Sequence, residues 1–170
     1  EIGDRRGEGA GLGNLGNAYS DLGQVEKAIE YYEKALAIFQ EIGDKREEGN
    51  GLGNLGLAYC DIGQFEKAIK YSEKALAIAQ EIEDRRGESR QLNNLGVAFQ
   101  RKNMYKEALA CYWLAKGIRA EIKYPKLKTT ESNLKSLKEK LGENEFEKIK
   151  AEVAPRAEEI VRKMLERTSV

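Results

Sequence analysis

The sequence has 170 residues, of which 34% are charged and 41% are hydrophobic, and its 29 basic side chains balance 29 acidic ones. A net charge of zero gives no global field that would draw the chain to nucleic acid or to an anionic membrane surface. Histidine is absent, which removes the commonest general base and metal ligand and argues against several enzyme classes.

Membrane and redox signals are also missing from the sequence. No apolar run reaches the roughly 18 residues that a membrane span needs, and no signal-peptide pattern opens the chain. Cys60 and Cys111 occupy different positions of different repeats, so two lone thiols fit a reducing compartment better than a disulfide framework. We therefore expect a cytoplasmic protein.

One stretch occurs three times at a spacing of 40 residues, as 11–19, 51–59 and 91–99. A period of about 20–50 residues predicts stacked repeats. Residues 1–7 match the segment that joins two copies, so we expect the remnant of a preceding repeat and a linker there. The missing initiator methionine suggests a fragment of a longer array.

Each copy predicts a pair of helices. In the second copy, apolar residues from Leu52 to Ile62 step by three and four positions, which is the spacing of one helical face. Gly63 suits a left-handed helix end, and the period then resumes from Phe65 to about Ile82. So short a turn requires antiparallel helices. The predicted repeats are 8–42, 48–82 and 88–122.

A glycine recurs in the middle of each predicted first helix, where it costs roughly 1 kcal/mol relative to alanine. We expect a close approach of the second helix to compensate, through small residues at a matching position. The glycines are Gly16, Gly56 and Gly96, and the small residues are Ala28, Ala68 and Ala108.

These positions resemble the signature of the tetratricopeptide repeat, with leucine where that signature usually has tryptophan. The second copy carries Ser72 in place of the usual aromatic residue, which predicts a smaller contact. The 40-residue period resembles the long-repeat branch that includes kinesin light chain and the Leu-Gly-Asn-repeat proteins. The first copy carries the signature as Leu12, Leu15, Gly16, Tyr19, Ala28, Tyr32 and Ala35.

The resemblance implies an all-α fold, a right-handed α-solenoid of antiparallel helix pairs. After 122 the repeat degrades. We expect residues 126–170 to form capping helices: a polar helix from Lys126 to Leu141, a segment from Phe146 to Val153, and a last amphipathic helix that begins at Pro155.

Two copies also match the glycine pattern of dinucleotide-binding loops, as in Gly11-x-Gly13-x-x-Gly16. That pattern needs a strand-to-helix turn. Here it lies within a predicted helix, so we expect no cofactor. We also predict no catalytic residues and no metal site.

In tetratricopeptide proteins the first helix of each pair lines a concave groove, and the resemblance places Asn14, Asn54 and Asn94 in it. An amide donates and accepts hydrogen bonds, so such a ladder can hold the backbone of a peptide. Alternatively, each asparagine only holds neighbouring repeats together. The family's chaperone-tail clamp needs a lysine where this chain has Gly13, so that specificity is not carried over.

The same geometry predicts further groove residues, and the groove then runs from acidic to basic. Residues 1–80 carry nine basic and fourteen acidic side chains, a net −5, and the remainder carries +5. A ligand with a cationic and an anionic end would fit; alternatively these charges are only solvated. The predicted residues are Asn17, Ser20, Asp21, Asn50, Leu57, Cys60, Asp61, Arg90, Asn93, Val97, Gln100 and Arg101.

The sequence therefore predicts a protein-interaction scaffold that binds an extended or helical peptide of a partner protein, with neither nucleic acid nor membrane as partner. The alternative is a structural spacer, or a module of a larger signalling protein that associates with itself through the groove or through exposed repeat ends.

Overall fold

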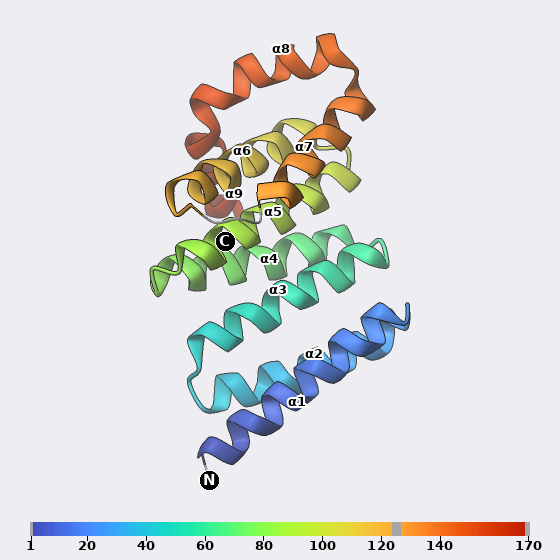
Figure 1. The fold of residues 1–170 in the computed structure, drawn as a ribbon, viewed down its shortest axis with the longest axis vertical. Coiled ribbons are helices and arrows are strands. Elements are labelled where there is room, and N and C mark those ends of the chain that lie inside the picture. Colours follow the sequence, from blue (N-terminus) through green and yellow to red (C-terminus); the bar gives the residue numbers. More distant parts are fainter. Residues whose placement is uncertain (1, 124–126, 169–170) are drawn as a thin grey trace. The chain divides into compact units, whose positions relative to one another are not determined.

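The computed structural model describes residues 2–123 and 127–168, in which every regular element is helical (Figure 1). The chain divides into two compact units, Glu1–Asp84 and Arg85–Val170. The first unit contains α1 (Ile2–Asp21), α2 (Val25–Glu41), α3 (Lys45–Asp61) and α4 (Phe65–Glu81). The second contains α5 (Arg85–Arg101), α6 (Tyr105–Glu121), α7 (Leu127–Leu141), α8 (Glu143–Val153), the 3-10 turn η1 (Ala154–Arg156) and α9 (Ala157–Thr168).

In the first unit, α1 packs on α2, α2 on α3, and α3 on α4. In the second unit, α6 packs on α5, on α7 and on the helices that follow α7. The buried core is dominated by the repeated small and branched positions, among them Ala28, Leu55, Ala68, Leu76 and Ala108. The all-α repeat solenoid is therefore confirmed.

The turns between helices share one hydrogen-bond pattern, which explains where the helices stop. At the end of α1, the Gln24 amide donates to the Tyr19 carbonyl over 2.9 Å and the Gly23 amide donates to the Ser20 carbonyl over 2.9 Å. This is a Schellman ending, and it needs a left-handed residue at Gly23, whose φ is +72°. The prediction of a left-handed Gly63 is confirmed, because its φ is +76°.

The glycines in the middle of the first helices face their partner helices, and the predicted close approach of the second helix is confirmed. A Cβ at Gly16 would lie 2.5 Å from the Tyr32 ring, and one at Gly96 would lie 2.4 Å from the Tyr112 ring. At Gly56 the nearest atom is the Ser72 hydroxyl, at 2.4 Å, followed by the Ala68 carbonyl oxygen at 3.2 Å. The tyrosine lies one helical turn beyond the alanine, and its ring is what fills the gap.

Both ends of the chain differ from the predicted boundaries. The predicted linker 1–7 is helical from Ile2 onward as part of α1. Its counterpart 41–47 contains a turn, because α2 ends at Glu41 and α3 begins at Lys45. Near the other end, Pro155 lies within η1 and the last helix begins two residues later, at Ala157.

The predicted helix from Lys126 begins at Leu127, since residue 126 lies outside the described residues. The same holds for Tyr124 and Pro125, at which the sequence predicted the preceding helix to end; that helix, α6, ends at Glu121.

Candidate peptide-binding surface

The predicted groove residues of the first unit come from α1 and α3, which run in the same direction (Figure 1). Residues on one helix that are three or four positions apart share a face. This spacing relates Asn14, Asn17 and Asp21 on α1, and it relates Asn54, Leu57 and Asp61 on α3. Since both helices end at the aspartate, the two carboxylates lie at corresponding ends.

A pocket of about 460 Å³ lies between these two helices. Six of the predicted groove residues line it: Asn17, Ser20, Asp21, Asn54, Leu57 and Asp61. Its remaining lining residues are Ala58 and Tyr32. The structure thus brings together, in one place, side chains of α1 and α3 that are 33 to 44 positions apart in the chain.

Tyr32 forms the inner part of this pocket, and it comes from α2 rather than from a predicted groove helix. Its ring is buried, and its hydroxyl donates a hydrogen bond to the Asn17 Oδ1 over 2.9 Å. Burial is the main cause that raises the pKa of Tyr32; a hydrogen bond with Ser20 opposes the rise, and the charge of Asp21 adds to it. The hydroxyl therefore stays protonated and fixes the orientation of the Asn17 amide.

Asn54 and Leu57 differ from most of α3 because they keep contact with solvent. Leu57 is 38% exposed, although it is a large apolar residue. Asn54 is half-buried, and within residues 2–123 and 127–168 its amide makes no hydrogen bond to another side chain. An apolar side chain and an unengaged amide therefore lie next to each other in one open pocket.

The charge at this pocket is negative for two reasons that add. Asp21 and Asp61 are both exposed there. They also end helices whose last turns contain no basic residue, and the last carbonyls of a helix carry partial negative charge. Two carboxylates and the ends of two helices therefore lie together at this pocket.

The other three predicted residues of the first unit do not line the pocket. Asn14 is exposed on α1. Asn50 is half-buried on α3, and its Nδ2 donates to the Glu47 Oε2 over 3.1 Å. Cys60, which the sequence also placed near the groove, is buried.

In the second unit the predicted asparagines bond to neighbouring side chains. Asn93 is 7% exposed, and its Oδ1 accepts hydrogen bonds from the Thr130 hydroxyl over 3.3 Å and from the Asn133 amide over 3.1 Å, both on α7. Asn94 donates to the Gln91 Oε1 over 3.1 Å. The Asn93 bonds join α5 to α7, as expected if an asparagine holds helices together, whereas the Asn94 bond stays within α5.

The remaining predicted residues of the second unit lie on α5 with more exposure. Arg90 and Arg101 are exposed, and Val97 is half-buried. Gln100 accepts a hydrogen bond from the Tyr112 hydroxyl over 2.9 Å and donates to the Ser136 hydroxyl on α7 over 3.4 Å. Hydrogen bonds therefore join α7 to part of this face of α5.

Sequence reasoning missed Tyr32 and Ala58 as pocket residues. The signal for Tyr32 was present, because it occupies the aromatic signature position and follows Gly16 by sixteen residues, as Tyr112 follows Gly96. That pairing marks the ring as the group that packs on the first helix. Ala58 could not be distinguished from the other core alanines, because it is as buried as they are and its place at the pocket depends on the neighbouring helix.

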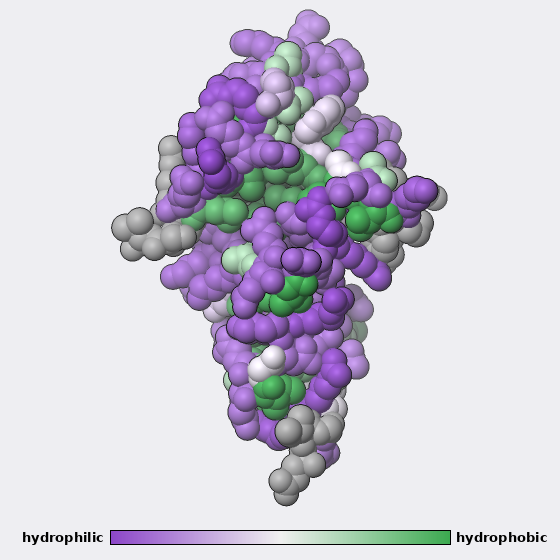
Figure 2. All heavy atoms as spheres, turned by 90° about the vertical axis from the view of Figure 1, so that its left-hand side faces the viewer, coloured by the Kyte–Doolittle hydropathy of each residue, from purple (hydrophilic) through white to green (hydrophobic). Residues whose placement is uncertain are grey.

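A second cavity, which the sequence did not suggest, lies in the other unit. It has a volume of about 650 Å³ and lies between α6 and the segment from η1 into α9, with Trp113, Leu114 and Ile118 as its apolar wall. Figure 2 shows a hollow with an apolar floor in the part of the molecule that contains these helices. Its charged rim consists of Arg85, Glu121, Arg156, Glu158 and Glu159.

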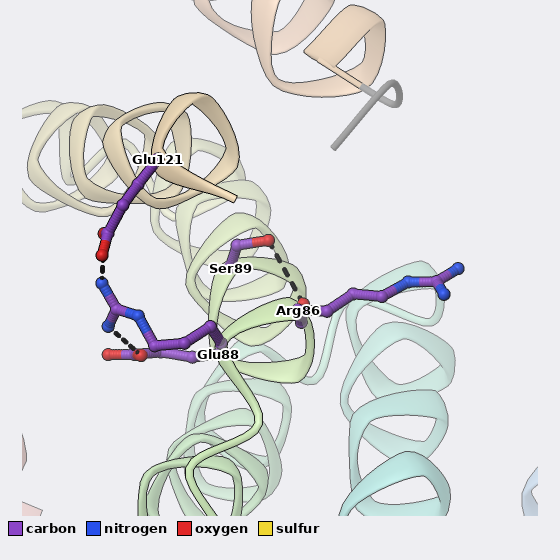
Figure 3. A network of polar contacts seen from close by, with 5 residues as sticks. Arg86, Glu88, Ser89 and Glu121 are labelled. Atoms are coloured by element: carbon purple, nitrogen blue, oxygen red, sulfur yellow. Dashed lines mark hydrogen bonds and ion pairs between the residues drawn. The ribbon is translucent and has the colours of Figure 1, made fainter. Parts of the chain in front are cut away.

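The charges of that rim are paired among themselves. The Arg85 guanidinium donates to Glu88 and, over 2.7 Å, to Glu121 (Figure 3). The bond to Glu121 is the main cause that raises the pKa of Arg85. The first repeat contains the same bridge, from Arg5 to Glu8 and Glu41, so this feature belongs to the repeat and does not mark the cavity as a site.

No helix in the described part of the chain has both the length and the apolar character that crossing a membrane requires.

The sequence was compared with known families and proteins. A family profile described as tetratricopeptide repeat matches residues 7–81 and 47–112. No curated protein sequence matches the chain.

Several solved structures resemble this one. BtubC (BKLC) from P. vanneervenii has 26% sequence identity and a TM-score of 0.69, over 90% of this chain and 63% of that one. The apo form of RapI has 21% identity and a TM-score of 0.72, over 81% and 38%. A putative kinesin light chain with nearly identical TPR-like repeats, from Podosopora anserina, has 18% identity and a TM-score of 0.61, over 94% and 90%.

This chain thus spans less than two thirds of BtubC and of RapI. The profile match covers more than half of the sequence and includes all three copies of the recurring stretch, 11–19, 51–59 and 91–99. The chain belongs to the tetratricopeptide repeat family.

Proposed function

We propose that this chain is a protein-interaction scaffold, and that it holds an extended or helical peptide of a partner protein against α1 and α3. The observation that carries the proposal is the half-buried Asn54, whose amide lies beside Leu57 in an open pocket. A peptide backbone offers the donors and acceptors that such an amide pairs with, and an apolar side chain beside it adds contact area.

Asn14 extends this surface along α1, one helical turn before the pocket residue Asn17. In the second unit the corresponding role falls to the exposed Arg90 and Arg101, which suit acidic groups of a ligand. Asn93 and Asn94 contribute less in this proposal, because their amides already bond within the unit.

The test is a peptide-display selection against the whole chain, followed by calorimetric titration of the selected peptides. Asn14→Ala combined with Asn54→Ala is expected to weaken binding about tenfold, which corresponds to about 1.4 kcal/mol. Asn144→Ala, at an exposed position of α8, is the matched control and is expected to bind as the parent does. Equal affinity of the double variant and the control would rule out the proposed surface.

A second candidate function is self-association through the outer face of α1. Leu15 is 46% exposed and Leu22 is 70% exposed, whereas Leu55, at the position of Leu15 in the second repeat, is fully buried. Light scattering over a concentration series distinguishes the two candidates. Self-association predicts a mass that rises with concentration and that Leu15→Glu returns to the monomer; a constant monomer mass contradicts it.

A further inference from the structure

We propose that a stripe along α1 binds an amphipathic helix of another polypeptide, one that carries the side chains with which α2 covers α3. Binding at this stripe is separate from the peptide binding proposed above, because the pocket residues Asn17 and Asp21 are not part of it. The stripe consists of Gly11, Leu15, Ala18 and Leu22.

The stripe combines apolar side chains with an open stretch of backbone. Its members are three or four positions apart, so they share one face of α1, and all of them are exposed. Leu15 and Leu22 are two of the large apolar side chains that this protein leaves in contact with solvent. A Cβ at Gly11 would meet no atom within 4 Å. Another backbone can therefore approach α1 closely at Gly11.

The same stripe recurs on α3, forty residues later, and there a helix covers it. Gly51, Leu55 and Ala58 are buried, and α2 packs on α3. A Cβ at Gly51 would lie 3.8 Å from the Cβ of Leu36, so α2 passes close to this glycine. The surface that α1 exposes is thus one that the protein buries under a helix where it occurs a second time.

The contacts between α2 and α3 define the helix that fits such a stripe. The Tyr59 hydroxyl donates a hydrogen bond to the Glu33 carboxylate over 3.2 Å. The Gln40 amide donates to the Glu48 carboxylate over 3.1 Å. Leu36 lies between Glu33 and Gln40 in the sequence, so α2 meets α3 with the pattern Glu-x-x-Leu-x-x-x-Gln.

The polar groups that this pattern requires are also present on α1. Tyr19 and Glu8 lie forty residues before Tyr59 and Glu48. Tyr19 stacks on a neighbouring tyrosine, as Tyr59 does, and Glu8 pairs with a basic side chain, as Glu48 does. Since these interactions do not prevent the contacts of α2 with α3, they leave the equivalent contacts open to a helix on α1.

The test uses a synthetic peptide of residues 25–42, blocked at both ends and labelled with a fluorophore. Fluorescence anisotropy measures its binding to the whole chain, and amide chemical shifts of the ¹⁵N-labelled chain show where it binds. The matched control peptide carries Leu36→Gln, which removes the apolar contact and keeps a good helix-forming residue. Light scattering measures the mass of the chain alone and with the peptide.

We expect the parent peptide to shift the amides of α1, and the Leu36→Gln peptide to bind at least about tenfold more weakly. Leu15→Gln in the chain should weaken binding of the parent peptide by a similar factor. Because Leu15 is exposed, its replacement leaves the buried core unchanged. Leu57→Gln changes an exposed leucine of the pocket on α3, and it should leave binding unchanged.

The two leucine variants of the chain separate the stripe from the pocket. Loss of binding in Leu57→Gln and not in Leu15→Gln would place the peptide in the pocket, which supports the proposed function and overturns the helix-binding stripe. Binding that Leu15→Gln alone weakens supports the stripe, even where the peptides selected by display fail to bind at the pocket.

The remaining outcomes concern the peptide and the mass of the chain. Absence of binding, or equal binding of the parent and Leu36→Gln peptides, overturns the proposed stripe. If the chain alone forms a dimer that the peptide does not dissociate, a second copy covers α1 and the proposed partner helix is wrong.

Discussion

At the scale of single residues, the left-handed position of each turn shows what a repeat tolerates. Gly23, Gly43 and Gly63 occupy it with a positive φ at no steric cost, whereas Glu83 and Asn103 hold φ values of +53° and +64°. Asparagine adopts this conformation with less strain than most residues do. Glutamate has no such advantage, so Glu83 is a strained position within an otherwise regular turn.

Replacement of Glu83 by glycine is therefore expected to stabilise the protein by about 1 kcal/mol, because glycine has no Cβ and adopts the left-handed backbone conformation without the steric cost that glutamate has. Thermal or urea unfolding measures the change. Gly43→Ala, at the same position of the preceding repeat turn, is the reverse experiment and should destabilise the protein. A decrease in stability on Glu83→Gly would contradict the explanation.

Two glycines of α1 separate helix propensity from packing. A Cβ at Gly13 would meet no atom within 4 Å, whereas one at Gly16 would lie 2.5 Å from the Tyr32 ring. Gly13→Ala is expected to stabilise the protein by about 1 kcal/mol. Gly16→Ala is expected to destabilise it by about 1–3 kcal/mol, because the ring is held by its bond to Asn17 and cannot move freely.

Denaturant unfolding of both variants provides the measurement. If both substitutions shift the midpoint in the same direction, then Tyr32 is not what requires glycine in the middle of α1.

The residue at position 72 differs from its counterparts in the other two repeats. Tyr32 and Tyr112 both direct their hydroxyls to first-helix side chains, Asn17 and Gln100. The second repeat has Ser72 at this position. The Ser72 hydroxyl is buried and has no hydrogen-bond partner among the described residues. The serine leaves one buried polar group unsatisfied, and the smaller contact predicted for this position stays a prediction.

At the scale of elements, the repeated aromatic pairs explain how a first and a second helix hold a fixed spacing. Tyr19 stacks on Tyr31 with ring centroids 5.2 Å apart, and Tyr59 stacks on Tyr71 with centroids 5.3 Å apart. Lys27 lies over the Tyr19 ring, at 5.3 Å from its centroid. Such offset contacts add to the burial of the apolar stripe and fix the crossing of the two helices.

In the last helix, α9, charged side chains near its beginning bond to one another. Glu159 accepts hydrogen bonds from Lys163 and from Arg156, and these two bonds lower its pKa from an ordinary value of 4.5 to about 2. A carboxylate in the first turn of a helix also interacts favourably with the helix dipole.

A lowered pKa in the folded state means that this contribution is fully present above pH 4.5. It is then lost as the pH falls through the folded pKa of about 2. Carbon-detected NMR titration of the Glu159 carboxyl group is expected to give this low value, and Lys163→Gln should return it toward 4.5. An unchanged pKa in that variant would contradict the assigned cause, because Lys163 is its largest contribution.

At the scale of the whole molecule, the repeats are near copies that lie in unequal surroundings. Residues 11–21 and 51–61 have almost the same sequence. In the first unit, α2 packs on α3, and no described helix of that unit covers the corresponding face of α1. A helix that leaves an apolar face uncovered opens more readily than one that is covered on both sides.

Hydrogen exchange measured by mass spectrometry tests this difference with matched intrinsic rates. Amides of residues 11–21 are expected to exchange about tenfold faster than those of residues 51–61, which corresponds to about 1.4 kcal/mol in opening free energy. The measurement requires a protein concentration at which the chain is monomeric. Equal protection of the two segments would contradict the exposed state of α1.

Much of this architecture could be predicted from the sequence, because the signals are local and repeated. The period of 40 residues, the helical stripe from Leu52 to Ile62 and the turn at Gly63 together predicted helix pairs and their boundaries. Each signal depends on a few neighbouring residues, and its recurrence distinguishes it from chance. The glycine pattern of Gly11 to Gly16 was correctly assigned to a helix for the same reason.

Only the tertiary structure decided which side chains meet. The sequence placed asparagines at equivalent positions, yet Asn54 stays unengaged beside a pocket while Asn93 bonds to α7. The sequence also did not show that the Tyr32 ring packs against Gly16. Nor did it show that Asp21 of α1 and Asp61 of α3 line the same pocket. Periodicity shows on which face of its helix a residue lies. The side chains that it contacts depend on how close the neighbouring helix lies and which residues that helix carries, and these residues are far away in the chain.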